Sequence, residues 1–381
     1  MQRETQLRLL QDCLDHIERR APDMAEASSS PVARYLDPGR YQAETQNLFR
    51  REPLLVGFSS QLAGVGDLIT HDAAGVPIVV VRQRDRSLKA YLNVCRHRGT
   101  RVVGGPCATG KRTLTCPYHG WTYSLDGKLA SMPHPAGFSG LDHSLIALVE
   151  LPVAEAYGMV FVRPMARGEA IDAAALLGPL AEDFASFGFA THVMHAPVEF
   201  TKAINWKLFF DASLEAYHFK HAHARTIATM FLDNQATWEW FERNGRGVLP
   251  KRSILELKAM PQEQWHIRER ANVLYSIFPN TVVLVEPDHA QIMQVWPTAI
   301  DRTLVTSCMF LPEAPADDKA REHWAKNATI FFNALEEDFD MMESIQCGLA
   351  TGANEELRFG RYEHQSAAFH RAVEASLPTQ K

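Results

Sequence analysis

Two short loops in the chain each combine one cysteine with one histidine. The first contains Cys95-x-His97, and the second contains Cys116-x-x-His119. Thiolate sulfur and neutral imidazole are both ligands that zinc and iron accept in proteins. Because two such loops can present four ligands to one compact centre, the spacing predicts a metal site rather than four unrelated buried side chains.

Two cysteines and two histidines suit either a structural zinc ion or a Rieske [2Fe–2S] cluster. Zinc sites usually pair cysteine with cysteine and histidine with histidine, whereas each loop here mixes the two residue types. The mixture is typical of a cluster in which one iron binds both thiolates and the other binds both imidazoles. Gly99 and Gly120 allow tight turns beside these ligands. The loops therefore favour an electron-transferring Rieske cluster over zinc.

A second group of candidate ligands lies in the segment NWKLFFDASLEAYHFKHAH. It begins as a predicted helix, on which Asp211, Glu215 and His218 can share one face. His218 and His223 would diverge by roughly 140° on an ideal helix, at about 100° per residue. Both can therefore reach one metal ion only if the helix ends or bulges near Phe219.

Two histidines and one carboxylate form the facial triad that binds non-haem iron and leaves positions open for O₂ and substrate. The chain offers local carboxylates and others on a later predicted helix, and spacing alone does not choose among them. The candidates are Asp211, Glu215, Glu336, Glu337, Asp338 and Asp340. Such a site, in a chain that also holds an electron-storing cluster, predicts an oxygenase.

The elements predicted around the cluster loops are short strands. From about residue 52 to 165, β-branched and apolar runs alternate with Gly, Asp and Pro. Asp126-Gly127 lies between two such runs and predicts a hairpin turn. We therefore expect a small all-β unit here. An amphipathic helix over residues 1–22, ended by Pro22, precedes it.

The rest of the chain, 166–381, mixes strand-like and helix-like patterns. Two helix-like stretches, 203–222 and 317–349, frame the strands and carry the candidate iron ligands. Strand-like runs occupy residues 192–200, 281–285 and 304–310.

Length, charge and cysteine count exclude several classes of protein. A chain of 381 residues leans towards two domains, and a net charge of −6 makes nucleic acid an unexpected partner. Its six cysteines are too sparse for a disulfide framework. With no run of about 18 apolar residues and no signal-peptide pattern, we expect no membrane span and a cytoplasmic location. The chain also lacks a Gly-rich dinucleotide fingerprint, so NAD(P)H electrons are expected through a separate reductase.

Both constellations resemble those of the large (alpha) terminal oxygenase subunits of the ring-hydroxylating Rieske non-haem iron oxygenases. The two Rieske boxes are matched by Asn93-x-Cys95-x-His97-Arg98-Gly99 and Cys116-Pro117-x-His119-Gly120-Trp121. The iron box and the late acidic helix are matched by Asn205-Trp206-Lys207, Glu215-x-Tyr217-His218, His223, Glu337-Asp338, Glu343 and Gln346. The resemblance extends from about residue 45 to 350.

The resemblance implies an α+β fold with three parts. Residues 1–44 would form an N-terminal helix and arm that packs on the catalytic domain. Residues 45–165 would form an all-β Rieske [2Fe–2S] domain. Residues 166–381 would form a helix-grip (START/Bet v1-like) catalytic domain with an antiparallel sheet.

For the cluster, the resemblance implies that Cys95 and Cys116 bind one iron. His97 and His119 would bind the other iron through Nδ1, leaving Nε2 free at the surface.

For the second site, the resemblance implies that His218, His223 and Asp338 bind a mononuclear Fe²⁺ ion. Glu215 falls where the family keeps a carboxylate that links this iron to the Rieske cluster of a neighbouring subunit. Asp211 is a further candidate catalytic residue, as an acceptor that orients a metal-binding histidine, or else only a charge on the helix face.

The implied function is that of the terminal oxygenase of a multicomponent enzyme, an oxidoreductase that incorporates oxygen from O₂. Electrons from NAD(P)H would arrive through a reductase, with or without a ferredoxin, and the subunits would form a homotrimer. The expected reaction is mono- or dioxygenation of an aromatic or other apolar small molecule, as in aromatic hydrocarbon catabolism.

The alternative substrate is a quaternary amine or a methoxy compound, which the enzyme would demethylate or monooxygenate. Trp238, Trp240 and Phe241 could then form a cage for the cation. Two other function classes stay open at this level: a non-catalytic Rieske electron carrier and a zinc-ribbon binding module.

Overall fold

The computed structural model describes residues 1–378, which form two compact units. The smaller unit contains Gln46–Leu176 and Gly188–His192. The larger unit contains Met1–Thr45, Leu177–Phe187 and the chain from Val193 onward. The predicted domain boundaries at 44/45 and 165/166 stay a prediction.

The smaller unit consists mainly of short antiparallel strands. A five-stranded sheet has the order β10-β5-β4-β3-β6, and two three-stranded sheets have the orders β11-β12-β2 and β7-β8-β9. The strands are β2 (Leu54–Phe58), β3 (Leu68–Ala73), β4 (Val76–Arg82), β5 (Leu88–Leu92), β6 (Cys107–Ala108), β7 (Thr113–Thr115), β8 (Thr122–Ser124), β9 (Leu129–Ser131), β10 (Glu150–Leu151), β11 (Val153–Ala156) and β12 (Met159–Val162).

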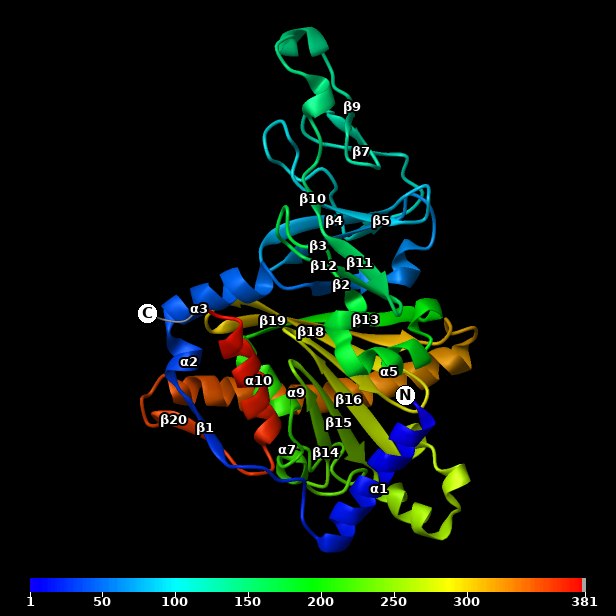
Figure 1. Cartoon of the computed structure of the whole chain (residues 1–381), viewed down its shortest axis with the longest axis vertical. Coiled ribbons are helices and arrows are strands. Elements are labelled where there is room, and N and C mark those ends of the chain that lie inside the picture. The colour runs from blue at the N-terminus through cyan, green and yellow to red at the C-terminus, as the bar shows by residue number, and fades with distance from the viewer. Residues whose placement is uncertain (379–381) are drawn as a thin grey trace. The chain divides into compact units, whose positions relative to one another are not determined.

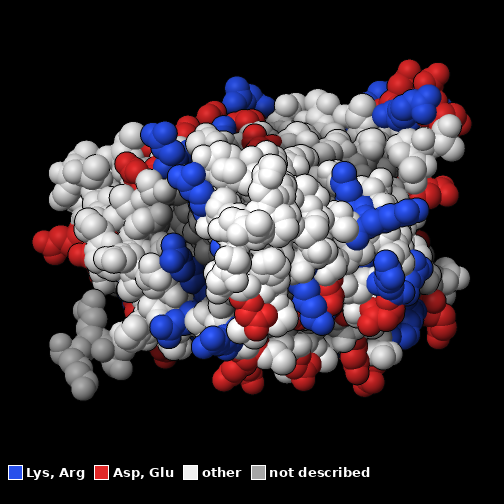
Figure 2. Space-filling model, turned by 90° about the horizontal axis from the view of Figure 1, so that it is seen from above, with Lys and Arg blue, Asp and Glu red and all other residues white. Residues whose placement is uncertain are grey.

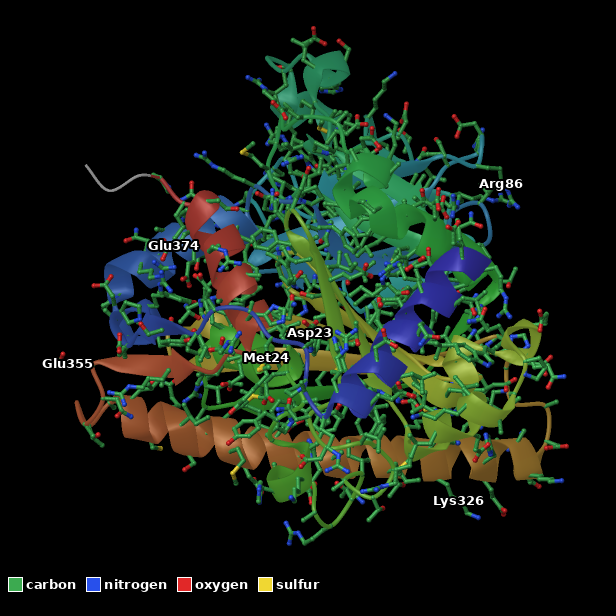
Figure 3. All side chains as sticks on the ribbon, turned by 60° about the horizontal axis from the view of Figure 1, so that its bottom comes forward. Asp23, Met24, Arg86, Lys326, Glu355 and Glu374 are labelled. Carbon is green, nitrogen blue, oxygen red and sulfur yellow. The ribbon has the colours of Figure 1, made fainter. Side chains whose placement is uncertain are left out.

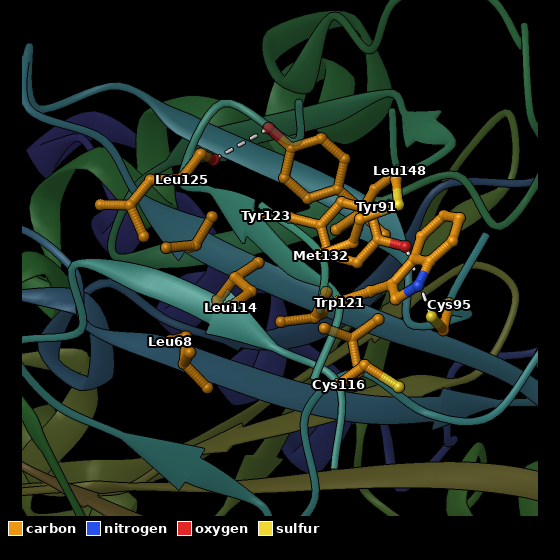
Figure 4. Close-up of a cluster of buried hydrophobic side chains, with 13 residues drawn as sticks. Leu68, Tyr91, Cys95, Leu114, Cys116, Trp121, Tyr123, Leu125, Met132 and Leu148 are labelled. Carbon is orange, nitrogen blue, oxygen red and sulfur yellow. Dashed lines mark hydrogen bonds between the residues drawn. The ribbon is translucent and has the colours of Figure 1, made fainter. Parts of the chain in front are cut away.

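A buried core packs beneath the two cysteine loops of the smaller unit (Figure 4). Tyr91 donates a hydrogen bond from its hydroxyl to the carbonyl of Leu125, 3.0 Å away. The predicted hairpin turn is present between β8 and β9, where Gly127 has φ of 86°. A Cβ atom on Gly127 would lie 2.6 Å from the Tyr91 ring, so both the turn and the close approach require glycine.

The larger unit is built on a seven-stranded antiparallel sheet of order β13-β19-β18-β17-β16-β15-β14 (Figure 1). The strands are β13 (Val193–Lys202), β14 (Thr237–Phe241), β15 (Asn244–Pro250), β16 (Ala271–Ile277), β17 (Thr281–Val285), β18 (Ala290–Ala299) and β19 (Arg302–Leu311). Its longer helices are α1 (Arg3–Arg19), α6 (Trp206–Ser213), α9 (Asp318–Leu349) and α10 (His364–Ala375). Short helices are α2 (Ala33–Leu36), α3 (Pro38–Glu44), α5 (Ala181–Ser186), α7 (Phe219–Ala222) and α8 (Ile267–Arg270), and α4 (Ala173–Leu177) joins the two units.

The long helix α9 packs along the sheet through aromatic side chains. Phe200 of β13 lies 5.3 Å from Phe339 and 5.9 Å from Phe332 of α9, measured between ring centroids. Figure 3 shows α9 with Lys326 on it, and Glu355 at the turn that leads to β20 (Glu356–Phe359). A long helix held against an antiparallel sheet agrees with the predicted helix-grip arrangement.

The N-terminal segment belongs to the larger unit. Helix α1 ends at Arg19 because Arg20 adopts a left-handed φ of 51°, three residues before the predicted stop at Pro22. Strand β1 (Ser28–Pro31) then pairs antiparallel with β20. The N-terminal arm is thus held in a two-stranded sheet with Glu356–Phe359.

No helix of the described residues is long and apolar enough to cross a membrane. On the face drawn in Figure 2, Lys and Arg side chains alternate with Asp and Glu around an area without charge. This mixture is unlike the single-sign surface of a typical nucleic-acid-binding protein.

Candidate metal centres

The two cysteine loops of the smaller unit close in the same way. Gly99 N–H donates to the carbonyl of Cys95 at 3.0 Å, and Gly120 N–H donates to the carbonyl of Cys116 at 3.1 Å. Both glycines have positive φ, 82° and 71°. Each loop is therefore a tight turn that a residue with a side chain would strain.

The four predicted ligands lie as two like pairs. His97 and His119 have ring centroids 4.6 Å apart, and the His97 ring stacks on Trp121 at 4.8 Å. Burial raises the pKa of Cys116, and the neighbouring Cys95 thiol adds to this effect. A sulfur pair beside an imidazole pair is the arrangement that a Rieske cluster needs.

Two observations test whether these residues fit that cluster. The Nδ1 atom of His97 is buried and has no hydrogen-bond partner, which suits a nitrogen that binds metal. Tyr123 Oη accepts from Arg96 N–H at 3.0 Å and lies 3.3 Å from Cys95 Sγ, so its own proton is free to be donated to a metal-bound thiolate there. The four residues therefore fit a [2Fe–2S] cluster.

The second candidate centre depends on how α6 is anchored in the larger unit. Asn205 caps α6, accepting from Lys207 N–H at 3.2 Å, while its own N–H donates to Gln346 of α9 at 2.8 Å. Trp206 Nε1 and Lys207 Nζ both donate to the buried carboxylate of Glu44, at 2.9 and 2.8 Å. The Asn-Trp-Lys motif thus anchors the helix rather than taking part in chemistry.

The prediction that one helix carries both Glu215 and His218 is wrong. Helix α6 ends at Ser213, and the next helix begins at Phe219. In the loop between them, Glu215 Oε2 accepts from the backbone N–H groups of Tyr217 and His218. Glu215 caps the new turn, so the break that lets both histidines converge begins earlier than expected.

Three side chains of the larger unit converge on one point. His223 Nε2 lies 3.1 Å from Asp338 Oδ1, and His218 Nε2 lies 3.5 Å from the same oxygen. Within residues 1–378, this is the only set of three or more His, Cys, Asp or Glu ligand atoms mutually within 4.8 Å. The cysteine loops do not form such a set, which argues against a single zinc ion there.

Each of these histidines is held from behind by a second carboxylate. His218 Nδ1 donates to Glu215 Oε1, and His223 Nδ1 donates to Glu337 Oε2 at 3.0 Å. Both rings therefore direct Nε2 towards Asp338, as metal-binding imidazoles do when a carboxylate fixes the other nitrogen.

The carboxylates around the two histidines favour a positive charge at this site. Burial alone would lower the pKa of His218, but Glu215 and Asp338 outweigh it and raise that pKa. Burial likewise opposes the raised pKa of His223, which the carboxylates of Asp338 and Glu337 produce. Two imidazoles and one carboxylate with open space beside them fit a mononuclear Fe²⁺ ion.

The remaining predicted carboxylates lie elsewhere. Asp211 accepts from Tyr35 Oη at 2.6 Å and from His370 Nε2 at 2.8 Å. The alternative in which Asp211 orients His218 or His223 is wrong, because its partners are Tyr35 and His370 and α6 ends before the loop that carries His218. Glu336 binds Lys202, and Asp340 is exposed.

A pocket with an empty volume of about 990 Å³, open mouth included, is lined by His218, His223 and Asp338. Its walls are mainly apolar and include three phenylalanine rings, Phe219, Phe231 and Phe331. No Lys or Arg is among the described residues that line it. An apolar lining beside a few polar groups suits a small organic molecule.

The predicted aromatic cage is not in this pocket. The rings of Trp238 and Trp240 lie over Gly247 and Gly245, their cross-strand neighbours on β15. The ring of Phe241 lies 5.3 Å from the Arg246 guanidinium. The cage prediction is therefore wrong, because β14 is the edge strand and these side chains pack on β15.

Two family descriptions match the chain. "Ring hydroxylating alpha subunit (catalytic domain)" matches residues 189–379, and "Rieske [2Fe-2S] domain" matches residues 52–150. The chain belongs to the Rieske ring-hydroxylating oxygenase alpha subunits.

Among its relatives in this family, choline monooxygenase of Beta vulgaris is 30% identical over 345 residues, which cover 88% of this chain and 73% of that protein. The carnitine monooxygenase oxygenase subunit of Escherichia coli (strain K12) is 27% identical over 334 residues, 85% of each chain.

Solved structures share the fold. The quaternary ammonium Rieske monooxygenase CntA in complex with L-carnitine superposes with a TM-score of 0.79 at 24% identity, covering 94% of this chain and 97% of that one. Naphthalene 1,2-dioxygenase from Rhodococcus sp. superposes with a TM-score of 0.76 at 20% identity, covering 98% and 99%.

As a Rieske oxygenase alpha subunit, the chain is the terminal oxygenase of its system and incorporates oxygen from O₂. It takes a [2Fe–2S] cluster and a mononuclear iron, and its electrons come from a separate reductase. The predicted α+β fold, enzyme class and cofactors are thereby confirmed. The match to the Rieske [2Fe-2S] domain excludes the zinc module, and the match to the catalytic domain excludes the electron carrier.

The predictions missed the role of Glu337. It was one of several acidic candidates on the later helix, and the structure makes it the partner of His223 Nδ1. The sequence signal for this role was the pair of consecutive acids on the late helix. Which of the two acids contacts which nitrogen of His223 depends on how α9 is rotated about its axis.

Proposed function

We propose that this Rieske oxygenase is a monooxygenase that inserts one oxygen atom into a C–H bond of a small alkylammonium compound. The observation that carries the proposal is the composition of the pocket beside His218, His223 and Asp338: apolar walls, carboxylates, and no Lys or Arg among its described lining residues. The relatives named choline, carnitine and glycine betaine monooxygenases support the same substrate class.

For the smaller unit, we propose that Cys95 and Cys116 bind one iron of the cluster and that His97 and His119 bind the other. The pairing of like ligands and the unpartnered Nδ1 of His97 support this assignment. The Tyr123 hydroxyl then holds its proton towards the Cys95 sulfur.

For the larger unit, we propose His218, His223 and Asp338 as the ligands of the mononuclear iron. When bound, the cluster supplies electrons and the iron supplies a place for O₂ next to the substrate. Glu215 and Glu337 orient the two imidazoles, and the apolar walls exclude bulk water from the reacting C–H bond.

We further propose that the chain works as a homotrimer, in which Glu215 connects the iron of one subunit to the cluster of its neighbour. Two observations support this role for Glu215: its carboxylate binds His218 Nδ1, and its side chain is buried. One CntA structure is described in terms of inter-subunit electron transfer. The cytoplasmic location expected from the sequence stays a prediction.

The test is a product screen under ¹⁸O₂ with a surrogate reductase and the metal-loaded chain. Choline, glycine betaine and L-carnitine are offered beside naphthalene, and products are identified by mass spectrometry. We expect one ¹⁸O atom in the hydroxylated product of an ammonium substrate, while the second oxygen atom leaves as water. Where an N-methyl group is hydroxylated, the product releases the amine and the label is found in formaldehyde. Labelled product from naphthalene alone would overturn the proposal.

Oxygenation of an aromatic compound is the second candidate. The three phenylalanine rings among the mainly apolar walls of the pocket favour it, because aromatic rings pack well against one another. A labelled naphthalene product that carries two ¹⁸O atoms would identify this activity as dioxygenation.

A further inference from the structure

One acidic side chain in the pocket has no part in the metal site. Glu286 follows directly on β17 and is one of the residues that line the same pocket as Asp338. Its side chain is 21% exposed. Glu286 is therefore a largely buried acid beside the space where a substrate must lie.

The neighbour of Glu286 on the next strand is also polar. Val285 of β17 pairs with Val273 of β16, which places Asn272 beside Glu286 on the pocket face of the sheet. Asn272 is 6% exposed, and its Oδ1 atom has no hydrogen-bond partner. An unpartnered buried acceptor next to a buried acid is costly unless a ligand reaches it.

The cations around Glu286 leave its charge incompletely balanced. His289 Nε2 lies 3.9 Å from its carboxylate, and His289 Nδ1 is already bound to Asp288 at 2.8 Å. Burial raises the pKa of Glu286, whereas His289 and Lys251 act against this rise. The Arg268 guanidinium binds the backbone carbonyl of Glu286 at 2.7 Å, and among the described residues no cation lies within 3.5 Å of the carboxylate itself.

The side chains that line the pocket carry more negative charge than a divalent ion balances. When a divalent ion is bound, the charges of Asp338 and Glu215 offset it, and Glu286 contributes one further negative charge. No described Lys or Arg lines the pocket to offset Glu286 or to receive a substrate carboxylate. A substrate with one positive charge and a neutral remainder complements this lining.

We infer that Glu286 is a specificity-determining residue that binds the positive charge of an organic monocation, with Asn272 receiving a hydroxyl group of the same molecule. This inference rests on the proposed function and narrows its substrate class. Zwitterions such as glycine betaine find no partner for their carboxylate in the pocket. Neutral molecules of the same shape leave the Glu286 charge unpaired.

The test measures binding to the metal-loaded full chain by calorimetry without O₂. The probes are choline, its neutral isostere 3,3-dimethyl-1-butanol, and glycine betaine. We expect choline to bind at least about tenfold more tightly than either other probe, since a largely desolvated ion pair contributes a tenfold or larger factor. Glu286→Gln should reduce the preference for choline over the isostere to within about twofold.

The matched control is Asp288→Asn, which removes the same charge two residues later from a side chain that is 54% exposed and outside the pocket lining. It should keep the preference for choline. Glu286→Asp retains the charge on a shorter side chain and should keep part of the preference for choline. It replaces the Gln variant in the test if that variant folds poorly. Equal binding of choline and its isostere to the unmodified chain, or an unchanged preference in Glu286→Gln, would overturn the inference.

These outcomes are distinct from failure of the proposed function. If the preference for choline depends on Glu286 but no ammonium compound is oxygenated, the proposed function is refuted and the cation-binding role of Glu286 still stands. Oxygenation of an ammonium compound without a charge preference would refute the Glu286 site and leave the proposed function.

Discussion

Glu337 accepts a hydrogen bond from Nδ1 of His223, 3.0 Å away, on the side of the imidazole opposite Asp338. Thr226 donates to the same Glu337 oxygen, at 2.5 Å. The interaction with His223 and with Thr226 lowers the pKa of Glu337 against the opposing effect of its burial, so it stays an acceptor at neutral pH. The carboxylate therefore fixes both the tautomer and the orientation of His223.

Replacing Glu337 by alanine should weaken metal binding at the larger unit by about 10- to 100-fold, because the ring of His223 loses its fixed orientation. The measurement is Co²⁺ or Fe²⁺ affinity by calorimetry, with the visible spectrum of the Rieske cluster as a check on the smaller unit. The control is Glu336→Ala, which removes the preceding acid, whose partner is Lys202. Equal metal affinity in the two variants would contradict the role of Glu337.

Replacing Glu215 by glutamine should separate metal retention from turnover. The amide oxygen can still accept from the backbone N–H groups of Tyr217 and His218, so the loop keeps its turn. The charge that we propose to join the two metal sites is lost, and we expect both metals to remain while product formation falls by about 10- to 100-fold or more. The measurement combines metal analysis with re-oxidation of the reduced cluster under O₂ and substrate. Normal turnover with both metals present would refute the bridge.

The two cysteine loops are the part of the candidate sites that is local in the sequence. The two cysteine loops could be predicted because each is a self-contained turn, closed by Gly99 or Gly120 onto its own cysteine carbonyl. Their ligands need no distant element to be recognised. The hairpin at Asp126-Gly127 was predictable for the same reason.

The iron site could be predicted only in part, because it joins segments far apart in the sequence. Nothing in Ser213-Leu214-Glu215 marks the end of α6, since it contains neither Gly nor Pro. The choice between Glu337 and Asp338 follows from the rotation of α9 against His223, which periodicity does not encode. Nothing in the sequence around Glu286 distinguishes it from a solvent-exposed acid at the end of a strand. Its place in the pocket depends on the register of β17 against β16.

The ion pair between Arg82 and Glu155 predicts a pH-dependent stability of the smaller unit. The two terminal guanidinium nitrogens of the buried Arg82, Nη1 and Nη2, bind Glu155 at 2.6 and 2.7 Å. The Arg82 hydrogen bonds lower the pKa of Glu155, against the opposing effect of burial. Glu155→Gln should therefore reduce the free energy of unfolding at neutral pH by about 1–3 kcal/mol.

The sign of the pH dependence follows from the lowered pKa. The stabilisation from Glu155 is present above its ordinary pKa of 4.5 and is lost as the pH falls through the lower value of the folded state. Denaturation of both chains at several pH values should thus show a difference that shrinks in acid. Glu150→Gln is the control, because Glu150 is 57% exposed and pairs with Lys89 at the surface. A difference that stays constant into acid, or an equal loss in the control, would count against the pair.

Tyr123 should tune the reduction potential of the cluster. Its hydroxyl accepts from Arg96 N–H, which leaves its proton directed at Cys95 Sγ, 3.3 Å away. A hydrogen bond to a ligand sulfur stabilises the reduced cluster, whose sulfurs carry more negative charge. Tyr123→Phe should therefore lower the potential. A difference of about 1 kcal/mol between the two redox states corresponds to ~40 mV for one electron.

The measurement is a spectroelectrochemical titration of the purified chain in its metal-loaded form. Tyr91→Phe is a matched control in the same core, because its hydroxyl donates to the carbonyl of Leu125 instead of a sulfur. It should change the potential little while costing a comparable amount of stability. If both variants shift the potential equally, the effect belongs to packing, and the hydrogen bond to Cys95 is not what sets it. A shift confined to Tyr123→Phe, with an intact visible spectrum, assigns the effect to that one proton.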